Sequence, residues 1–348
     1  MTRARIRFGL LSFAHYHAHA WAEAARGSDD GDLVGIWDDD PERGREAAER
    51  YGVPFADDLD DLLGRVDAVG ITAETMSHPA LVERAAGAGV HVLCEKPAAV
   101  DLAAFGRISV AVQQAGIAFA QSFPKRLDPA SLALREIIED GRLGRVGLVR
   151  LRHGHSQGLD TVFRATWFTD PARSGGGALL DEGVHVLDFA AWLLGPPGWV
   201  RAAPVSNAQL GLPVDDTALV IAGYPDGRLA ELATSWAFVA ADSSIEVHGE
   251  RGSAVLGGVD LASRDLAGEP PLRVCLERPS AGRRRAWQAI DVRPAFQGGD
   301  FHQLPVRRFL ADLRHGRQPD IGLDDARRSL ELVAAASEAA RTGGTVEL

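Results

Sequence analysis

The segment Gly89-Val-His-Val-Leu-Cys-Glu-Lys-Pro97 decides the first half of the fold. Its apolar run ends in an acid, a lysine and a proline, which is typical of a buried strand that opens into a polar turn. The sequence around it repeats such strands in alternation with helical patterns, and this alternation predicts a doubly wound parallel sheet. We expect strands at residues 6–11, 33–37, 66–71, 90–94 and 117–121, with helices that include residues 21–26, 41–51 and 79–88.

The character of the sequence changes after about Phe123. A helix expected at residues 129–140 is followed by long β-type runs at 146–155, 217–224, 228–238 and 244–248, and turn residues join the later runs. We therefore expect two domains, residues 1–123 and residues 124–348. The second is expected to be an α/β domain with a large, mostly antiparallel open sheet and a last helix at about 323–342.

The composition excludes several classes of function. With 48 acidic and 37 basic residues, the 348-residue chain has a formal charge of −11, so we expect no nucleic-acid partner. Two cysteines cannot form a disulfide framework or a zinc ribbon. No run approaches the ~20 apolar residues that span a bilayer. The apolar run near the N-terminus is too short for a secretory signal. We expect a cytoplasmic protein with no membrane partner.

The turn after the first strand is where a sheet of this type would hold the pyrophosphate of a dinucleotide. Ser12, Ala14 and His17 stand where a Gly-x-Gly-x-x-Gly fingerprint has its glycines, so the motif alone gives little support for a nucleotide. The first two replacements are small, and a helix that starts here still offers amide groups to phosphate. The residues expected to contact the cofactor in this turn are Ser12, Phe13, Ala14 and His15.

The histidines of the same turn also suggest a metal site. On a helix, His15 and His19 would share one face, with His17 between them. No acidic or cysteine ligand sits nearby at a matching spacing, so we expect no metal and favour contact with the cofactor or packing.

A carboxylate follows the second strand at Asp38, at the distance expected for the acid that binds the ribose hydroxyls of the adenosine. Such an acid repels a 2′-phosphate, so NAD is favoured over NADP. The alternative is a helix N-cap cluster, and Asp40, which precedes Pro41, is expected to be that cap. Arg43 keeps NADP as the minority alternative.

Glu95 and Lys96 follow the fourth strand at the edge where open α/β sheets bind ligands. Pro97 holds the backbone of Lys96 extended, and the bond between them is a candidate for the cis form. The alternative interpretation is a surface lysine in a turn.

Residues 175–194 begin with three glycines and continue as one expected helix. Asp181, His185 and Asp188 form a polar stripe beside an apolar stripe, and other apolar residues make the helix largely buried. Buried charged groups are costly unless they are paired or functional. Asp181 and His185, four residues apart, can orient one another as a general base and its partner do, or they form a satisfied structural pair.

Together these segments resemble the glucose–fructose oxidoreductase / inositol dehydrogenase family (Gfo/Idh/MocA). The resemblance runs nearly end to end and implies a Rossmann domain that binds NAD or NADP at residues 1–123. It implies a substrate-binding and oligomerisation domain at 124–348. Members of the family oxidise or reduce a carbon of a sugar, cyclitol or related polyol. The resemblance is carried by residues 89–97, Gly141-Arg-Leu-Gly144-Arg-Val146, Gly175–Asp181 with His185, and the closing Gly343 and Val346.

The resemblance also implies roles for individual residues. Lys96, Asp181 and His185 match the catalytic residues of the family. His185 would remove the hydroxyl proton while hydride leaves the same carbon, Asp181 would orient the imidazole, and Lys96 would hold the reacting oxygen. Glu95, Thr72 and His78 are expected to line the cofactor together with Lys96. The expected substrate contacts are Arg126, His153 and Trp167. For His153, which shares one face of a strand with His155, packing is the alternative and is slightly favoured.

Two other functions stay open beside an NAD(P)-dependent oxidoreductase. The first keeps the fold and oxidises a sugar only transiently, as a lyase, hydrolase or epimerase does. The second is a non-catalytic sensor with weakened cofactor binding, which the altered turn at Ser12 motivates. The resemblance further implies a homodimer or homotetramer and a small carbohydrate or polyol as substrate.

Overall fold

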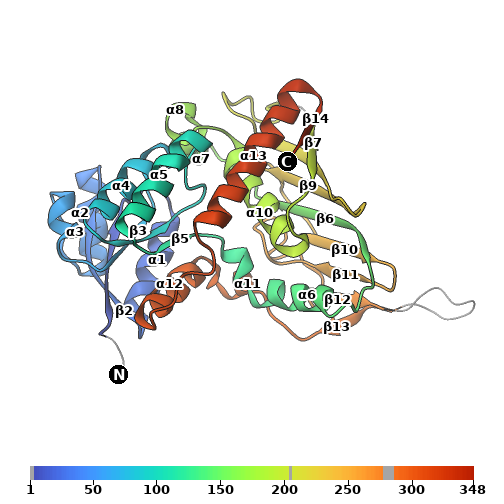
Figure 1. Cartoon of the computed structure of the whole chain (residues 1–348), viewed down its shortest axis with the longest axis horizontal. Coiled ribbons are helices and arrows are strands. Elements are labelled where there is room, and N and C mark those ends of the chain that lie inside the picture. The colour runs from blue at the N-terminus through green and yellow to red at the C-terminus, as the bar shows by residue number, and fades with distance from the viewer. Residues whose placement is uncertain (1–3, 204–205, 277–285) are drawn as a thin grey trace, which may run out of the picture. The chain divides into compact units, whose positions relative to one another are not determined.

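The computed structural model describes residues 4–203, 206–276 and 286–348, and the chain divides into two compact units (Figure 1). The first unit comprises Met1–Pro124, Ala172–Gly175 and His302–Leu330. The second comprises Lys125–Pro171, Gly176–Phe301 and Glu331–Leu348. The first boundary lies one residue from the position expected at 123/124, whereas the expected division into two continuous domains does not include the return of residues 302–330 to the first unit.

The first unit is built on a five-stranded sheet in the order β2-β1-β3-β4-β5, and all its strand pairs are parallel. The predicted doubly wound parallel sheet is therefore confirmed. The chain reverses its direction of winding between β1 and β3, and sheets of this order bind ligands at the carboxyl ends of the strands at that point. The strands are β1 (Ile6–Leu11), β2 (Gly31–Trp37), β3 (Ala68–Ile71), β4 (His91–Cys94) and β5 (Phe119–Gln121).

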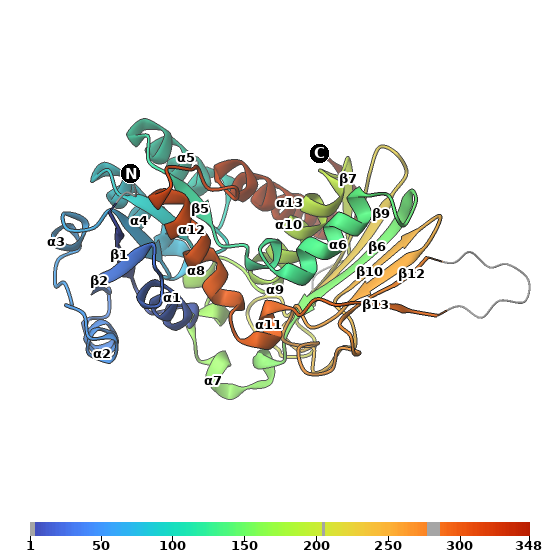
Figure 2. The same ribbon diagram turned by 90° about the horizontal axis from the view of Figure 1, so that it is seen from below.

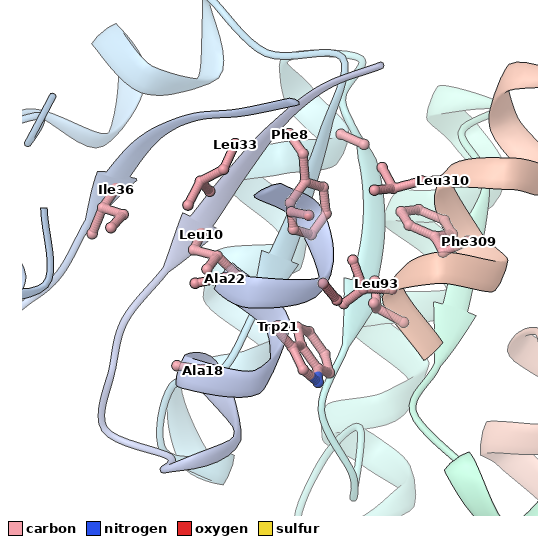
Figure 3. Packing of buried hydrophobic residues seen from close by; sticks show 14 of the residues in the cluster. Phe8, Leu10, Ala18, Trp21, Ala22, Leu33, Ile36, Leu93, Phe309 and Leu310 are labelled. Carbon is pink, nitrogen blue, oxygen red and sulfur yellow. The ribbon is translucent and has the colours of Figure 1, made fainter. Parts of the chain in front are cut away.

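The core of the first unit explains why a late segment of the chain belongs to it. Phe8 and Leu10 of β1 point to one face of the sheet, where they meet Trp21 of α1 and Phe309 and Leu310 of α12 (Figure 3). All five side chains are fully buried, and burying one of the larger ones contributes about 1.5–3 kcal/mol to stability. The helices of this unit are α1 (His17–Arg26), α2 (Pro41–Tyr51), α3 (Leu59–Leu63), α4 (His78–Gly87), α5 (Leu102–Ala115) and α12 (Leu304–Arg314).

The second unit is built on a nine-stranded sheet in the order β13-β12-β11-β10-β6-β9-β8-β7-β14. Only β6 and β9 pair in parallel, so the predicted large and mostly antiparallel sheet is confirmed. The strands are β6 (Val146–Gly154), β7 (Trp199–Ala202), β8 (Thr217–Gly223), β9 (Leu229–Ser235), β10 (Ile245–Gly249), β11 (Ser253–Leu256), β12 (Leu272–Cys275), β13 (Gln288–Ile290) and β14 (Thr345–Glu347).

Helices α6 and α10 lie along one face of this sheet (Figure 2). The apolar side chains of α10 pack on β6 and β9, which places the polar residues of that helix beside the centre of the sheet. Within the described residues, no helix is long and apolar enough to cross a membrane. The remaining helices are α6 (Pro129–Glu139), α7 (Thr161–Arg164), α9 (Ala178–Asp181), α10 (Gly183–Leu194) and α11 (Ala295–Gly298), with α8 (Pro171–Ser174) and α13 (Leu323–Thr342) shared between the two units.

Candidate active site

The turn after β1 keeps the backbone shape of a glycine turn although the glycine is absent. Ser12 has φ +72°, in the left-handed region that favours glycine. Its Oγ accepts a hydrogen bond from the backbone N–H of Ala14 and lies 3.4 Å from a carboxylate oxygen of Asp38. Thr72 donates from its hydroxyl to the carbonyl of Ser12 at 2.6 Å, which ties the carboxyl ends of β1 and β3 together. The serine side chain thus offsets part of the backbone strain.

Asp38 is completely enclosed by hydrogen-bond donors. Its carboxylate accepts from the backbone N–H of Phe13 at 2.7 Å, from that of Asp40 at 3.0 Å, and from the guanidinium of Arg43. Burial works to raise the pKa of Asp38, but these hydrogen bonds outweigh it and hold the pKa below its usual value. Asp38 therefore fixes the turn, and the neighbouring Asp39, whose side chain is 56% exposed, presents the accessible carboxylate at this strand end.

Asp40 is the N-cap that the sequence predicted. It caps α2, with its carboxylate accepting from the N–H groups of Glu42 and Arg43.

The third fingerprint position carries a histidine that packs into a buried polar cluster. Nδ1 of His17 lies 2.8 Å from Oε1 of Glu95, and its ring stacks on His302 at 3.8 Å between centroids. The other oxygen of Glu95 accepts from the backbone N–H of Lys96 at 2.8 Å. Burial raises the pKa of Glu95 and holds the pKa of His15 well below its usual value. His17 therefore replaces a glycine contact with a side-chain link to the Glu95–Lys96 turn.

Lys96 is one of only two lysines in the chain, whereas 35 of the 37 basic residues other than histidine are arginines. It is 4% exposed and follows β4 at the carboxyl edge of the sheet, so the interpretation as a surface lysine is wrong. The Lys96–Pro97 bond is cis. His78 lies between the carbonyl oxygens of Pro97 and Ala73, at 2.9 and 3.0 Å from its two ring nitrogens, and braces the loop that carries the lysine.

These observations fit a dinucleotide in the first unit. The positive-φ turn at Ser12 is retained, and the N-terminus of α1 begins at the same strand end, where it can meet a phosphate. Thr72 follows β3 on the other side of the point where the sheet reverses its winding. Asp38 and Asp39 close the carboxyl end of β2 with negative charge.

In the second unit, the glycine-rich segment forms two helices where one was expected. The helix breaks at Glu182, between α9 and α10. Asp215 explains the preceding glycines: its carboxylate accepts from the N–H groups of Gly177 and Leu179, and its backbone lies so close that a Cβ at Gly177 would be 2.0 Å from its carbonyl oxygen. The prediction of a continuous helix is wrong, because the segment forms α9 and α10 with a break at Glu182, and the contact with Asp215 fixes where α9 begins.

Asp181 and His185 lie on the two sides of this break. Asp181 accepts a hydrogen bond from the indole N–H of Trp236 at 3.0 Å. His185 is 7% exposed, and its ring is 4.7 Å from that of His153 between centroids. His153 belongs to β6, so the structure brings one of the expected substrate contacts beside the expected base.

The other two expected substrate contacts are buried in the second unit. Arg126 is bound to Asp188 of α10, with its Nε 2.8 Å from a carboxylate oxygen, and this pair anchors the helix. Trp167 is 6% exposed and stacks on Phe168 at 4.0 Å.

Sequence reasoning missed two buried charged residues near His153. Glu182 has one carboxylate oxygen 2.9 Å from Nε2 of His153 and the other 3.6 Å from Nε2 of His155. Lys125 donates to the carbonyl of Val259 at 3.0 Å, and burial lowers its pKa. The sequence did offer a signal for Lys125: it is one of only two lysines in an arginine-rich chain. Glu182 lay outside the polar stripe of the expected helix.

Comparison with known proteins gives two family models that match the chain. "Oxidoreductase family, NAD-binding Rossmann fold" matches residues 8–122, and "GFO/IDH/MocA C-terminal domain" matches residues 131–255. Inositol 2-dehydrogenase of Rhizobium meliloti (strain 1021) is 30% identical over 77% of this chain and 82% of its own length. D-apiose dehydrogenase of Paraburkholderia graminis is 29% identical over 98% of this chain and 88% of its own.

Solved structures show the same fold. The aldose-aldose oxidoreductase of Caulobacter crescentus, complexed with glycerol, has a TM-score of 0.82 at 24% identity and covers 99% of this chain and 100% of its own. Levoglucosan dehydrogenase in complex with NADH and levoglucosan has a TM-score of 0.81 at 23% identity, with 99% of each chain covered.

Proposed function

Because the chain belongs to the Gfo/Idh/MocA oxidoreductase family, we propose that it is an NAD-dependent dehydrogenase or reductase of a sugar, cyclitol or related polyol. The reaction interconverts a secondary alcohol and a ketone. The observation that carries the proposal is one chain that holds both a buried lysine after β4, in the Glu95–Lys96–Pro97 turn, and the Asp181–His185 pair at the α9–α10 break. Relatives named for inositol and apiose dehydrogenation support the substrate class.

We favour NAD over NADP as the cofactor. When bound, the nicotinamide would accept or donate the hydride. The turn at Ser12–His15 and the N-terminus of α1 would hold the pyrophosphate. Asp39, the accessible carboxylate at this strand end, would face the adenosine ribose, while Asp38 holds the turn behind it. Arg43 is the cation that could bind a 2′-phosphate, but it already forms ion pairs with the carboxylates of Asp38 and Asp39. The 2′-phosphate of NADP would therefore be repelled by these carboxylates, and Arg43 is not available to balance its charge.

The catalytic roles follow the family residues at these positions. His185 takes the proton of the substrate hydroxyl, and Asp181 orients its imidazole while bound to Trp236. Lys96 matches the catalytic lysine of the family, so we assign it a hydrogen bond to the reacting oxygen, whose developing negative charge it would stabilise. His153 and Trp167 contact the substrate, and Arg126 contributes through its hold on Asp188.

The test is turnover with a panel of polyols and aldoses, with NADH absorbance and product formation measured together. Stoichiometric NADH accumulation supports the proposal. Product formation without net NADH would instead support transient oxidation, and tight NAD binding without any product would support a sensor. Lys96→Met and His185→Ala are the matched variants, and each should lose turnover while NAD binding is retained. Native mass spectrometry of the purified protein tests both the bound nucleotide and the proposed homodimer or homotetramer.

A further inference from the structure

A buried group of two imidazoles and a carboxylate lies in the second unit. His153 on β6, Glu182 at the helix break and His185 on α10 place candidate ligand atoms within 4.8 Å of one another. The residues are 8%, 6% and 7% exposed. A second group, His155, Asp181 and Glu182, meets the same distance limit and shares the glutamate. The two oxygens of Glu182 thus face two different histidines.

Two buried polar atoms beside this group have no hydrogen-bond partner among the described residues. They are Nδ1 of His153 and Oγ1 of Thr234. The two residues are register partners on the parallel strands β6 and β9, so they sit side by side. Nε2 of His153 is the ring nitrogen beside Glu182, so it is the candidate ligand atom, and the unpartnered Nδ1 faces away from it. A histidine that binds a metal commonly donates its second N–H to a nearby oxygen, and Thr234 is the neighbouring residue that carries one.

The local charge also favours a cation. The carboxylates of Asp128, Asp260 and Glu182 all act on Lys125, which is the basic residue among them. A divalent ion would offset the excess negative charge.

We propose that His153, Glu182 and His185 bind one divalent transition-metal ion of the zinc, cobalt or nickel class. Two imidazoles with one carboxylate suit these ions, whereas magnesium and calcium prefer oxygen ligands. Bonds of about 2.0–2.2 Å to a tetrahedral ion place neighbouring ligand atoms roughly 3.3–3.6 Å apart. Nε2 of His153 and Oε2 of Glu182 are 2.9 Å apart, so a small separation would let both bind one ion. Asp181, fixed by Trp236, stands beside the ion as an outer carboxylate.

The ion would compete with catalysis, an effect that rests on the proposed function. The imidazole of His185 cannot give one lone pair both to a metal and to a substrate proton. Metal binding should therefore inhibit polyol oxidation, and a chelator should restore it. Binding of the ion itself does not depend on any activity.

The experiment is calorimetric titration of the full-length, chelator-treated protein with Zn²⁺ and with Co²⁺. One equivalent per chain is expected, and His153→Gln should weaken binding by at least tenfold. His248→Gln is the matched control, because His248 is 43% exposed and lies 3.7 Å from Glu246 in the same unit. His17→Gln tests the first-unit group of His15, His17 and Glu95, and it should leave zinc binding unchanged.

Several results would overturn the site. Unchanged affinity in a folded His153→Gln protein would do so, and so would loss of binding in His17→Gln or His248→Gln. If His153→Gln does not fold, X-ray absorption of the zinc-loaded unsubstituted protein decides instead. The spectrum is recorded for zinc-loaded His17→Gln as well, because His15, His17 and Glu95 offer the same ligand types. Two imidazole ligands with additional oxygen in both proteins support the site, and oxygen-only ligands, or loss of an imidazole in His17→Gln, refute it. A failure of polyol turnover with metal binding intact would refute the proposed function alone.

Discussion

Two turns of the first unit and the neighbouring residues His153 and Thr234 of the second unit use their buried polar side chains differently. In the first unit, the carboxylate of Asp38 accepts from two backbone amides and from Arg43, and both ring nitrogens of His78 face carbonyls. In the second unit, His153 and Thr234 each keep a buried polar atom without a partner in the described part of the chain.

The difference separates two tasks. Satisfied buried groups fix the backbone: Asp38 and His78 hold the turns that follow β1 and β4, and these turns position Ser12 and Lys96. Unsatisfied buried groups are costly unless something else satisfies them. Asp38 and His78 therefore shape loops of the first unit, whereas His153 belongs to the proposed metal site. Unpartnered buried atoms also occur in the first unit, at Nε1 of Trp21 and Oε1 of Gln121.

The largest expected effect comes from Lys96. Lys96→Met removes the ammonium without changing the loop that His78 braces, so turnover should fall by roughly 10²–10⁴-fold while NAD affinity changes little. Steady-state kinetics and NAD titration measure the two separately. Lys96→Arg is the control for charge, and it should also fail because a guanidinium has a different shape. Unimpaired turnover in Lys96→Met would remove this lysine from the mechanism.

The buried ion pair of the second unit should give the largest loss of stability. Asp188→Asn leaves Arg126 buried beside a neutral partner, and such losses cost about 3–5 kcal/mol. Urea denaturation measures the change. The control is Glu250→Gln, which breaks the exposed Arg145–Glu250 pair and should cost roughly 0–1 kcal/mol. Equal losses in the two variants would mean that burial does not distinguish the pairs.

The buried histidines predict a loss of stability in acid. Burial lowers the pKa of His15, His78 and His153 in the folded protein, so each binds a proton more readily when unfolded. Stability should then fall as the pH drops below about 6.5, by up to ~1.4 kcal/mol per pH unit for each histidine. His153→Gln should make this dependence shallower in urea denaturation. An unchanged slope would show that His153 does not carry a depressed pKa.

The smallest effect concerns the strained turn. Ser12→Ala keeps the positive φ and loses the hydroxyl, whereas Ser12→Gly relieves the strain. The alanine variant should be less stable than the glycine variant by about 1 kcal/mol, measured by thermal or urea unfolding. The opposite order would mean that the positive φ at residue 12 is not a source of strain, because both variants lack the hydroxyl.

The sequence predicted those features that local patterns determine. Alternating strands and helices located the parallel sheet, and Asp40 followed by Pro41 located the start of α2. The return of α12 could not be predicted, because Phe309 and Leu310 pack on residues about 300 positions earlier and no local pattern records that contact.

The candidate site was predictable to the same extent. Lys96, Asp181 and His185 stand in recognisable segments, whereas the start of α9 at Ala178 is fixed by Asp215, which is more than thirty residues away. The fixed position of Asp38 likewise depends on Arg43 reaching back to it from α2.

The central claim is that Lys96 lies in the binding site of a nicotinamide nucleotide. Because the chain has only two lysines, this claim can be tested directly. Protein labelled with ¹³C at the lysine ε-carbon should give two side-chain signals, from Lys96 and Lys125, assigned with Lys96→Arg and Lys125→Arg. The account predicts a saturable shift of the Lys96 signal as NAD is added to the full-length protein. A Lys96 signal that stays in place at saturating NAD would contradict it.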